Sequence, residues 1–184
     1  MRVLQITIPE RDFFDDSKQE FIKVKKQTLT LEHSLISISK WESKWKKPFL
    51  SSNDRTKEES LDYIKCMSIG PIADENVLHC LSNSEYKQIA DYINDNCTAT
   101  WFNERNNKRK IGSGQTVTSE LIYYWMIAYD IPSEYQKWHL NRLLTLIRIC
   151  DNKNSPSKKM KKKDIFAQNR ALNEARKKKL GTRG

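Results

Sequence analysis

The chain has 184 residues, of which 38% are hydrophobic, so it is long enough for one domain with a real core. Its 33 lysine and arginine residues outnumber its 23 aspartate and glutamate residues, which gives a formal net charge of +10. No apolar run approaches the roughly 20 residues of a membrane span, and Gln5, Thr7 and Pro9 interrupt the apolar start of the chain, so we expect neither a membrane helix nor an export signal.

The N-terminal residues predict a β-hairpin. Apolar and polar residues alternate over residues 4–8, which is the period of a half-buried strand, and Pro9 ends that strand because proline cannot donate to a sheet. The alternation returns over residues 21–25, where two lysines separate the apolar positions. We therefore expect a two-stranded hairpin over about residues 2–26, with its loop in residues 10–18, where turn-forming polar side chains gather.

The next segment fits two patterns. Apolar residues that step by three or four from Leu31 to Trp45 share one face of a helix, whereas Leu29 and Leu31 alternate with polar residues as in a strand. We favour a helix over about residues 30–46, because the helical stripe persists across about four turns. Pro48 then ends it.

Two shorter helices are predicted by capping boxes, in which a Ser or Thr and a Glu three residues later satisfy backbone N–H groups at a helix start. One box precedes residues 57–67 and another precedes residues 84–95, and each segment has an apolar face. The β-branched and aromatic residues 98–102 predict a strand or an extended packing segment. Residues 103–115 are rich in Asn, Lys, Arg and Gly and predict an exposed loop.

The last two predicted helices of the domain have its clearest helical patterns. Residues 118–129 are apolar nearly all round, which predicts a central helix, and residues 133–150 have one apolar face. The break at residues 130–133 is short, so we expect an antiparallel helix pair. Together these elements predict an α+β fold that is predominantly α-helical, in which a small N-terminal β-hairpin region packs on a helical domain.

The composition changes sharply after residue 152. Residues 153–184 contain twelve basic and two acidic residues, so the whole net charge of +10 lies there, and residues 1–152 carry 21 residues of each sign. We therefore predict a neutral globular domain over residues 1–152 and a basic C-terminal tail over residues 153–184. Residues 164–179 contain good helix formers but only a thin apolar face, so we expect a helix there that needs a partner to stay formed.

The sequence predicts no catalytic residue, no metal site and no cofactor. His33, His79 and His139 each lie among apolar residues, where we expect satisfied core or surface histidines rather than acid–base groups. Gly112 and Gly114 lack the further residues of a phosphate-binding loop. The four cysteines have no C-x-x-C spacing, so we expect buried, reduced thiols.

The aromatic residues point to packing rather than chemistry. The five tryptophans occur among Leu and Ile at helical spacings, so we expect them in the core, with Trp45 beside three lysines as the one candidate for an exposed ring. A neutral domain with large aromatic side chains and no chemical site is typical of a module that binds another protein.

The basic tail is the candidate binding site. It suits an acidic protein surface, on which it would fold as it binds, and it also suits nucleic-acid phosphates without sequence preference. The plain alternative is a solvated, solubilising extension. No base-reading module precedes the tail, which disfavours sequence-specific nucleic-acid binding. The candidate partner-binding residues are Lys158, Lys159, Lys161, Lys162, Lys163, Arg170, Arg176, Lys177, Lys178, Lys179 and Arg183.

Several segments of the chain resemble a known family. Residues 29–50, 118–127 and 136–150 and the ending at residues 180–184 are similar to proteins encoded among the tail genes of tailed bacteriophages, which are described as tail assembly chaperones or as tail or structural proteins. The resemblance covers most of the chain, from about residue 29 to residue 184. It rests on packing residues rather than on a chemical motif.

The resemblance implies a non-enzymatic assembly factor made in the cytoplasm of the infected bacterium. Such chaperones bind the tape measure protein, keep it soluble and help to bring tail tube subunits to it, and some are also made in a longer, frameshifted form. A virion structural protein of the neck, tail or capsid is the alternative, and nonspecific nucleic-acid binding through the tail is a second one. A homo-oligomer is compatible with these readings, and we expect no membrane partner.

Overall fold

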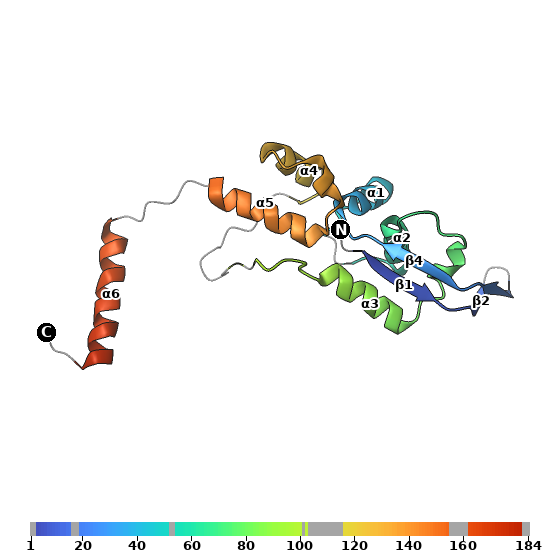
Figure 1. Ribbon diagram of the computed structural model, residues 1–184, viewed down its shortest axis with the longest axis horizontal. Coiled ribbons are helices and arrows are strands. Elements are labelled where there is room, and N and C mark those ends of the chain that lie inside the picture. The colour runs from blue at the N-terminus through green and yellow to red at the C-terminus, as the bar shows by residue number, and fades with distance from the viewer. Residues whose placement is uncertain are drawn as a thin grey trace. The chain divides into compact units, whose positions relative to one another are not determined.

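The computed structural model (Figure 1) describes residues 3–15, 19–51, 54–100, 102, 116–154 and 162–181. The fold is α+β and mostly helical. The chain divides into two compact units, Met1–Cys150 and Asp151–Gly184. The first unit contains the strands and the hydrophobic core, and the second contains the helix of the basic tail.

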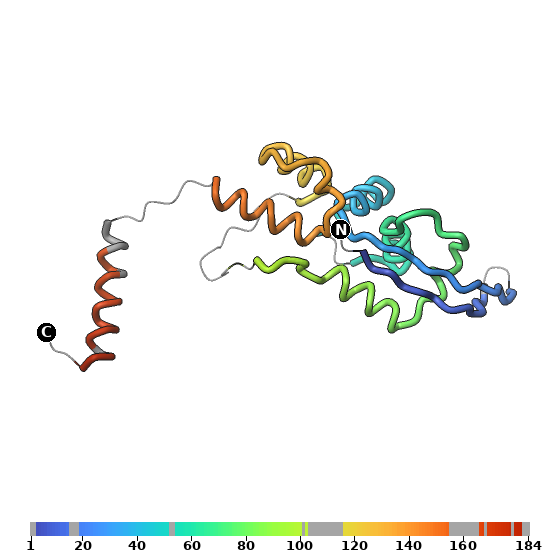
Figure 2. The backbone as a smooth tube through the Cα atoms, in the orientation of Figure 1, coloured from blue at the N-terminus to red at the C-terminus, as the bar shows by residue number. Residues whose placement is uncertain are grey.

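The first unit opens with two antiparallel strand pairs that follow one another along a β-ribbon. β1 (Leu4–Ile8) pairs with β4 (Gln27–Leu31), and β2 (Arg11–Asp15) pairs with β3 (Glu20–Val24). Figure 2 shows the backbone running out through β1 and β2 and returning through β3 and β4.

The predicted two-stranded hairpin is wrong in its pairing. Ile6 of β1 lies opposite Leu29 and not opposite a residue of 21–25, and Phe14 of β2 lies opposite Phe21. The segment expected as a loop therefore contains a strand. Its charged residues concealed this strand, because the alternation of apolar and polar residues that marks a half-buried strand is broken there.

Arg11 attaches this unexpected strand to the helical part of the domain. Its guanidinium donates to both carboxylate oxygens of Glu85, at 2.9 and 3.1 Å, and also to the carbonyl of Cys80. Glu85 is buried in the first turn of α3 (Asn83–Asn94) and accepts the backbone N–H of Ser82 at 2.6 Å. The paired guanidinium thus attaches β2 to the start of α3.

The helix α1 spans Leu35–Trp45, so the predicted helix began five residues too early. Residues 30 and 31 belong to β4, as the alternative strand pattern indicated. The helix starts where the side chain of Ser34 accepts a hydrogen bond from the backbone N–H of Ser37. It ends at Lys46, which adopts a left-handed conformation with φ of 55°.

The two predicted capping boxes are confirmed, at the start of α2 (Lys57–Met67) and at the start of α3. In each box the Thr or Ser side chain accepts a backbone N–H three residues later, and the Glu side chain accepts the N–H of the capping residue. The short 3-10 helix η1 (Glu75–Leu78) lies between α2 and α3.

The strand, one of the two alternatives predicted for residues 98–102, is not found in the described residues 98–100 and 102. The N–H of Thr100 donates to the side chain of Thr98 at 3.1 Å, and this local turn competes with strand pairing. Phe102 is half-buried under the guanidinium of Arg148, whose central carbon lies 4.0 Å from the ring centroid. Trp101 and the predicted loop at residues 103–115 lie outside the described residues.

The last predicted helix of the domain differs from the structure in its division and in its end, which lies at Asn154 rather than at residue 150. α4 spans Ser119–Ala128, as expected. The helix expected over residues 133–150 is instead two elements, the 3-10 helix η3 (Ser133–Lys137) and α5 (Leu140–Asn154). They are separate because the backbone between them forms a β-bridge with the residue that caps α1.

The prediction that α4 is a central helix is wrong. Ile122 and Met126 are buried, but Tyr124 and Ile127 on the opposite side are 63% and 76% exposed. The helix is apolar nearly all round, yet it packs against α1 through one face only. Composition alone could not show this, because a fully apolar helix is normally buried on every side.

Trp41 is the largest fully buried side chain of the core. Its indole N–H donates to the carbonyl of Glu59 at 2.8 Å, and its ring meets the ring of Phe49 edge-on at 5.2 Å. These contacts join α1 to the start of α2 and to the loop between them. The other large, fully buried apolar side chains of the core are Ile8, Leu31, Leu35, Ile38, Met67, Ile122, Leu140, Leu143 and Ile147.

Glu42 joins three parts of the domain through one buried carboxylate. One of its oxygens accepts the N–H of Phe49 at 2.7 Å, and the other accepts the N–H of Ser119 at 2.7 Å. The second bond lies at the N-terminus of α4, where unpaired N–H groups and the helix dipole favour a negative charge. The carboxylate therefore fixes α1, the loop that follows it and α4 relative to one another.

Replacing Glu42 with alanine should lower the free energy of unfolding by about 3 kcal/mol, because two buried N–H groups lose a charged acceptor. The matched control is Glu58→Ala on the exposed side of α2, which should stay within about 0.5 kcal/mol of the parent protein. Urea unfolding followed by circular dichroism measures both. Equal losses in the two variants would contradict the role given to Glu42.

Candidate functional site

Polar aromatic side chains surround His33, which lies in the link between β4 and α1. The Nδ1 atom of His33 is 2.6 Å from the hydroxyl of Tyr63, and its backbone N–H donates to the hydroxyl of Tyr92 at 3.2 Å. The ring of His139 lies 5.0 Å away, and its Nε2 atom is 2.9 Å from the carbonyl of Tyr92. His33 and His139 are 2% and 3% exposed, so a substrate could not reach them.

The protonation states around His33 support a structural role. Burial, together with smaller contributions from the nearby His139 and Arg55, lowers the pKa of His33 to about 3. Burial also raises the pKa of Tyr63 well above its ordinary value. At neutral pH the imidazole of His33 is therefore uncharged and the hydroxyl of Tyr63 keeps its proton. As the sequence predicts, His33 and His139 are core histidines, whereas His79 is exposed.

A surface pocket of about 510 Å³ lies over the outer side of α2, between the end of α1 and η1. Leu61 and Leu78 contribute its apolar surface, together with the half-buried ring of Trp45. Its charged lining is balanced, with three lysines and three carboxylates. The lining residues are Lys44, Trp45, Lys57, Glu58, Leu61, Asp62, Lys65, Glu75, Leu78 and His79.

Hydrogen bonds hold the polar residues of this pocket in place. The indole N–H of Trp45 donates to Asp62 at 2.9 Å, and Lys44 pairs with the other oxygen of the same carboxylate. Lys65 pairs with Glu75 at 2.5 Å. Trp45 is thus anchored to α2 and is not the freely exposed ring that the neighbouring lysines suggested. The pocket has no excess charge that would select an anion or a cation.

The described part of the chain contains no group of three or more His, Cys, Asp or Glu side chains that could hold a metal ion. The four cysteines all lie within that part, are half-buried and form no disulfide. Burial raises the pKa of Cys66 and of Cys80, which keeps both thiols protonated. Among the described helices, none is long and apolar enough to cross a membrane.

The candidate partner-binding residues belong to the second unit, where α6 (Lys162–Leu180) forms a helix of 19 residues. Arg170, Arg176, Lys177 and Lys179 are exposed on this helix. Arg170 also makes an ion pair with Glu174, with 3.7 Å between its Nε atom and the carboxylate. Both partners are largely exposed, so this pair adds little stability.

The structure describes the remaining candidate residues only in part or not at all. The backbones of Lys162, Lys163 and Lys178 belong to α6, but their side chains lie outside the described part. Lys158, Lys159, Lys161 and Arg183 lie wholly outside the described residues.

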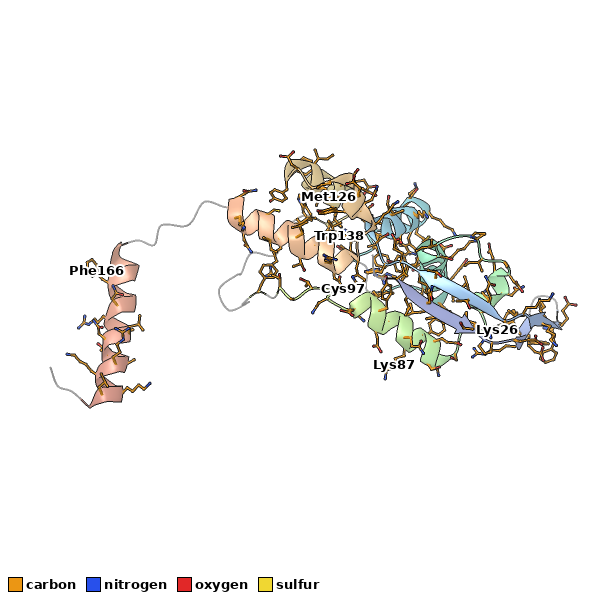
Figure 3. The ribbon with its side chains drawn as sticks, in the orientation of Figure 1. Lys26, Lys87, Cys97, Met126, Trp138 and Phe166 are labelled. Atoms are coloured by element: carbon orange, nitrogen blue, oxygen red, sulfur yellow. The ribbon has the colours of Figure 1, made fainter. Side chains whose placement is uncertain are left out.

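Sequence reasoning missed the apolar side chains at the two ends of α6. Phe166 and Leu180 are 69% and 72% exposed, and Leu172 between them is 47% exposed. Figure 3 shows Phe166 standing out from the helix. The sequence carried the signal, because Phe166 and Leu180 are fourteen residues apart and so lie on the same side of a helix after about four turns.

Basic and apolar side chains therefore share the exposed surface of α6, while the buried acids Glu42, Glu59 and Glu85 of the domain accept hydrogen bonds within the fold. Searches of protein-family models, curated proteins and solved structures found no match to this chain.

Acid should destabilise the domain through His33. The unfolded chain binds a proton on this side chain near pH 6.5, whereas the folded chain does so only near pH 3, so the free energy of unfolding falls as the pH drops between these values. Between pH 7 and pH 5 we expect a loss of about 2 kcal/mol from this group.

Urea unfolding at pH 7, 6 and 5 measures this effect. The His33→Gln variant should lose that part of the pH dependence, because glutamine does not titrate. The His79→Gln variant should keep it, since His79 is exposed. An unchanged pH dependence in His33→Gln would show that another group is responsible.

Proposed function

We propose that the protein is a non-enzymatic bacteriophage tail assembly chaperone, which binds the tape measure protein and tail tube subunits in the cytoplasm of the infected bacterium. The observation that carries the proposal is a separate unit with an exposed helix, on which basic and apolar side chains stand side by side. The resemblance of the sequence to tail assembly chaperones supplies the biological setting.

The distribution of charge supports binding through the tail. Residues 151–184 contain twelve basic and three acidic residues, and residues 1–150 contain 21 basic and 20 acidic residues. The tail unit therefore carries +9 of the net charge and the domain carries +1. A helix with so many like charges and so few apolar residues is only weakly stable by itself, so an acidic partner surface would stabilise it.

The arrangement of the domain supports a scaffold for that tail. The His33 group is buried, and the acidic side chains of Glu42, Glu59 and Glu85 each accept a backbone N–H within the fold. These polar groups hold elements together and are closed to a substrate. A stable domain of low net charge can carry a charged binding segment without competing with it for an acidic partner.

Co-expression with the tape measure and tail tube proteins of the same phage tests the proposal. A soluble complex should co-purify at low salt and dissociate as salt rises, because exposed charge pairs are screened. Replacing Arg176, Lys177 and Lys179 with glutamine should reduce recovery of the complex. Replacing the exposed domain residues Lys25, Lys26 and Lys87 with glutamine is the matched control and should leave recovery unchanged. Failure to co-purify at low salt would count against the proposal.

The proposal also predicts whether the chain is present in the finished phage particle. An assembly chaperone leaves before the virion is complete, so mass spectrometry of purified phage should not detect the chain. Its presence in stoichiometric amount would instead identify a virion structural protein of the neck, tail or capsid.

A further inference from the structure

Every described side chain of α6 is exposed, and five of them lie along one line of the helix, which we call the α6 seam. It consists of Phe166, Asn169, Asn173, Arg176 and Leu180, which are spaced alternately by three and four residues. This is the spacing with which one helix packs lengthwise against another. Apolar residues occupy both ends of the α6 seam and polar residues occupy its middle.

Basic side chains flank the α6 seam on both sides. Arg170 and Lys177 follow the seam positions on one side, and Lys179 lies on the other side together with Leu172. All four are exposed. In paired helices these flanking positions face the flanking positions of the partner, and their charges decide which partner is accepted. The flanks of α6 therefore favour a helix with acidic flanks.

A second copy of α6 fits this surface poorly. The helix contains seven basic and two acidic residues, so two copies side by side would bring like charges together. One of the two acidic residues, Glu174, already lies beside Arg170. A lipid surface also fits poorly, because Asn169, Asn173 and Arg176 interrupt the apolar face that would enter the membrane.

We propose that α6 binds an acidic amphipathic helix of its partner, lying lengthwise along the α6 seam. Phe166 and Leu180 pack at the two ends, Asn169 and Asn173 face polar residues in the middle, and the basic flanks face carboxylates. The middle of the seam is polar, so the ends supply the apolar contact and the flanks supply most of the attraction. This inference rests on the proposed function, because tail assembly provides the partner.

A binding experiment with the full chain tests the helix pairing directly. The probe is a synthetic three-heptad peptide with leucine along its seam, asparagine in the middle and glutamate on both flanks. The comparison probe is a peptide of the same composition in scrambled order, and a short duplex DNA provides a second polyanion. Fluorescence anisotropy at low salt should show at least about tenfold tighter binding of the ordered peptide than of either comparison probe.

Variants of α6 separate packing from charge. Phe166→Ser and Leu180→Ser should each weaken binding of the ordered peptide by about tenfold. Ala171→Ser is the matched control, because Ala171 is exposed on the opposite side of α6 and the change also replaces an apolar residue with serine. It should leave the affinity within about twofold, and circular dichroism of each variant checks its helix content.

Two outcomes would overturn the inference. Equal binding of the scrambled peptide or the DNA would show that α6 attracts polyanions without pairing with a helix. Unchanged affinity in Phe166→Ser and Leu180→Ser would show that the seam is not used. The proposed function fails separately: if the ordered peptide binds as expected but the phage tail proteins do not co-purify, the pairing stands and the tail assembly role does not.

Discussion

The fold depends on the hydrogen bonds at His33, where the ribbon passes into the first helix. The hydroxyl of Tyr63 from α2 meets the ring of this residue, the hydroxyl of Tyr92 from α3 meets its N–H, and the N–H of Leu140 at the start of α5 donates to its carbonyl at 2.9 Å. Buried polar groups need partners at defined positions, so one residue sets where three helices sit against β4. Apolar packing then fills the space around Trp41, but it is less selective about position than these bonds are.

Buried carboxylates also hold elements of the domain in place through hydrogen bonds and ion pairs. Glu59 binds the N–H of Thr56 and pairs with Lys47, and both interactions hold the pKa of Glu59 below its ordinary value. The pKa of Glu85 also lies below its ordinary value. Burial alone would raise this pKa, but the hydrogen bonds from the N–H of Ser82 and from the guanidinium of Arg11 outweigh the effect of burial. These acids are used inside the fold, and each has a donor of its own. With 21 basic and 20 acidic residues, the domain as a whole carries a net charge of +1.

The two units of the chain are stabilised in different ways. The domain satisfies its polar groups internally and holds its shape through long-range contacts. The tail helix has exposed apolar residues and many like charges, and its described side chains form one weak surface ion pair, so its stability and its specificity both have to come from another molecule. This difference is why the proposed binding site lies in the tail, although the domain contains a surface pocket and the buried histidines.

Local patterns in the sequence determined the helix starts at Thr56 and Ser82 and the confinement of net charge to the tail, because caps and charge counts involve residues close in the chain. Only the tertiary structure decided that β1 pairs with β4, that residues 11–15 pair with residues 20–24, and that Arg11 reaches Glu85, 74 positions away. The tertiary structure also decided which face of α4 is exposed and that the 3-10 helix η3 ends before His139. Each results from contacts between distant residues, which a pattern read along the chain does not contain.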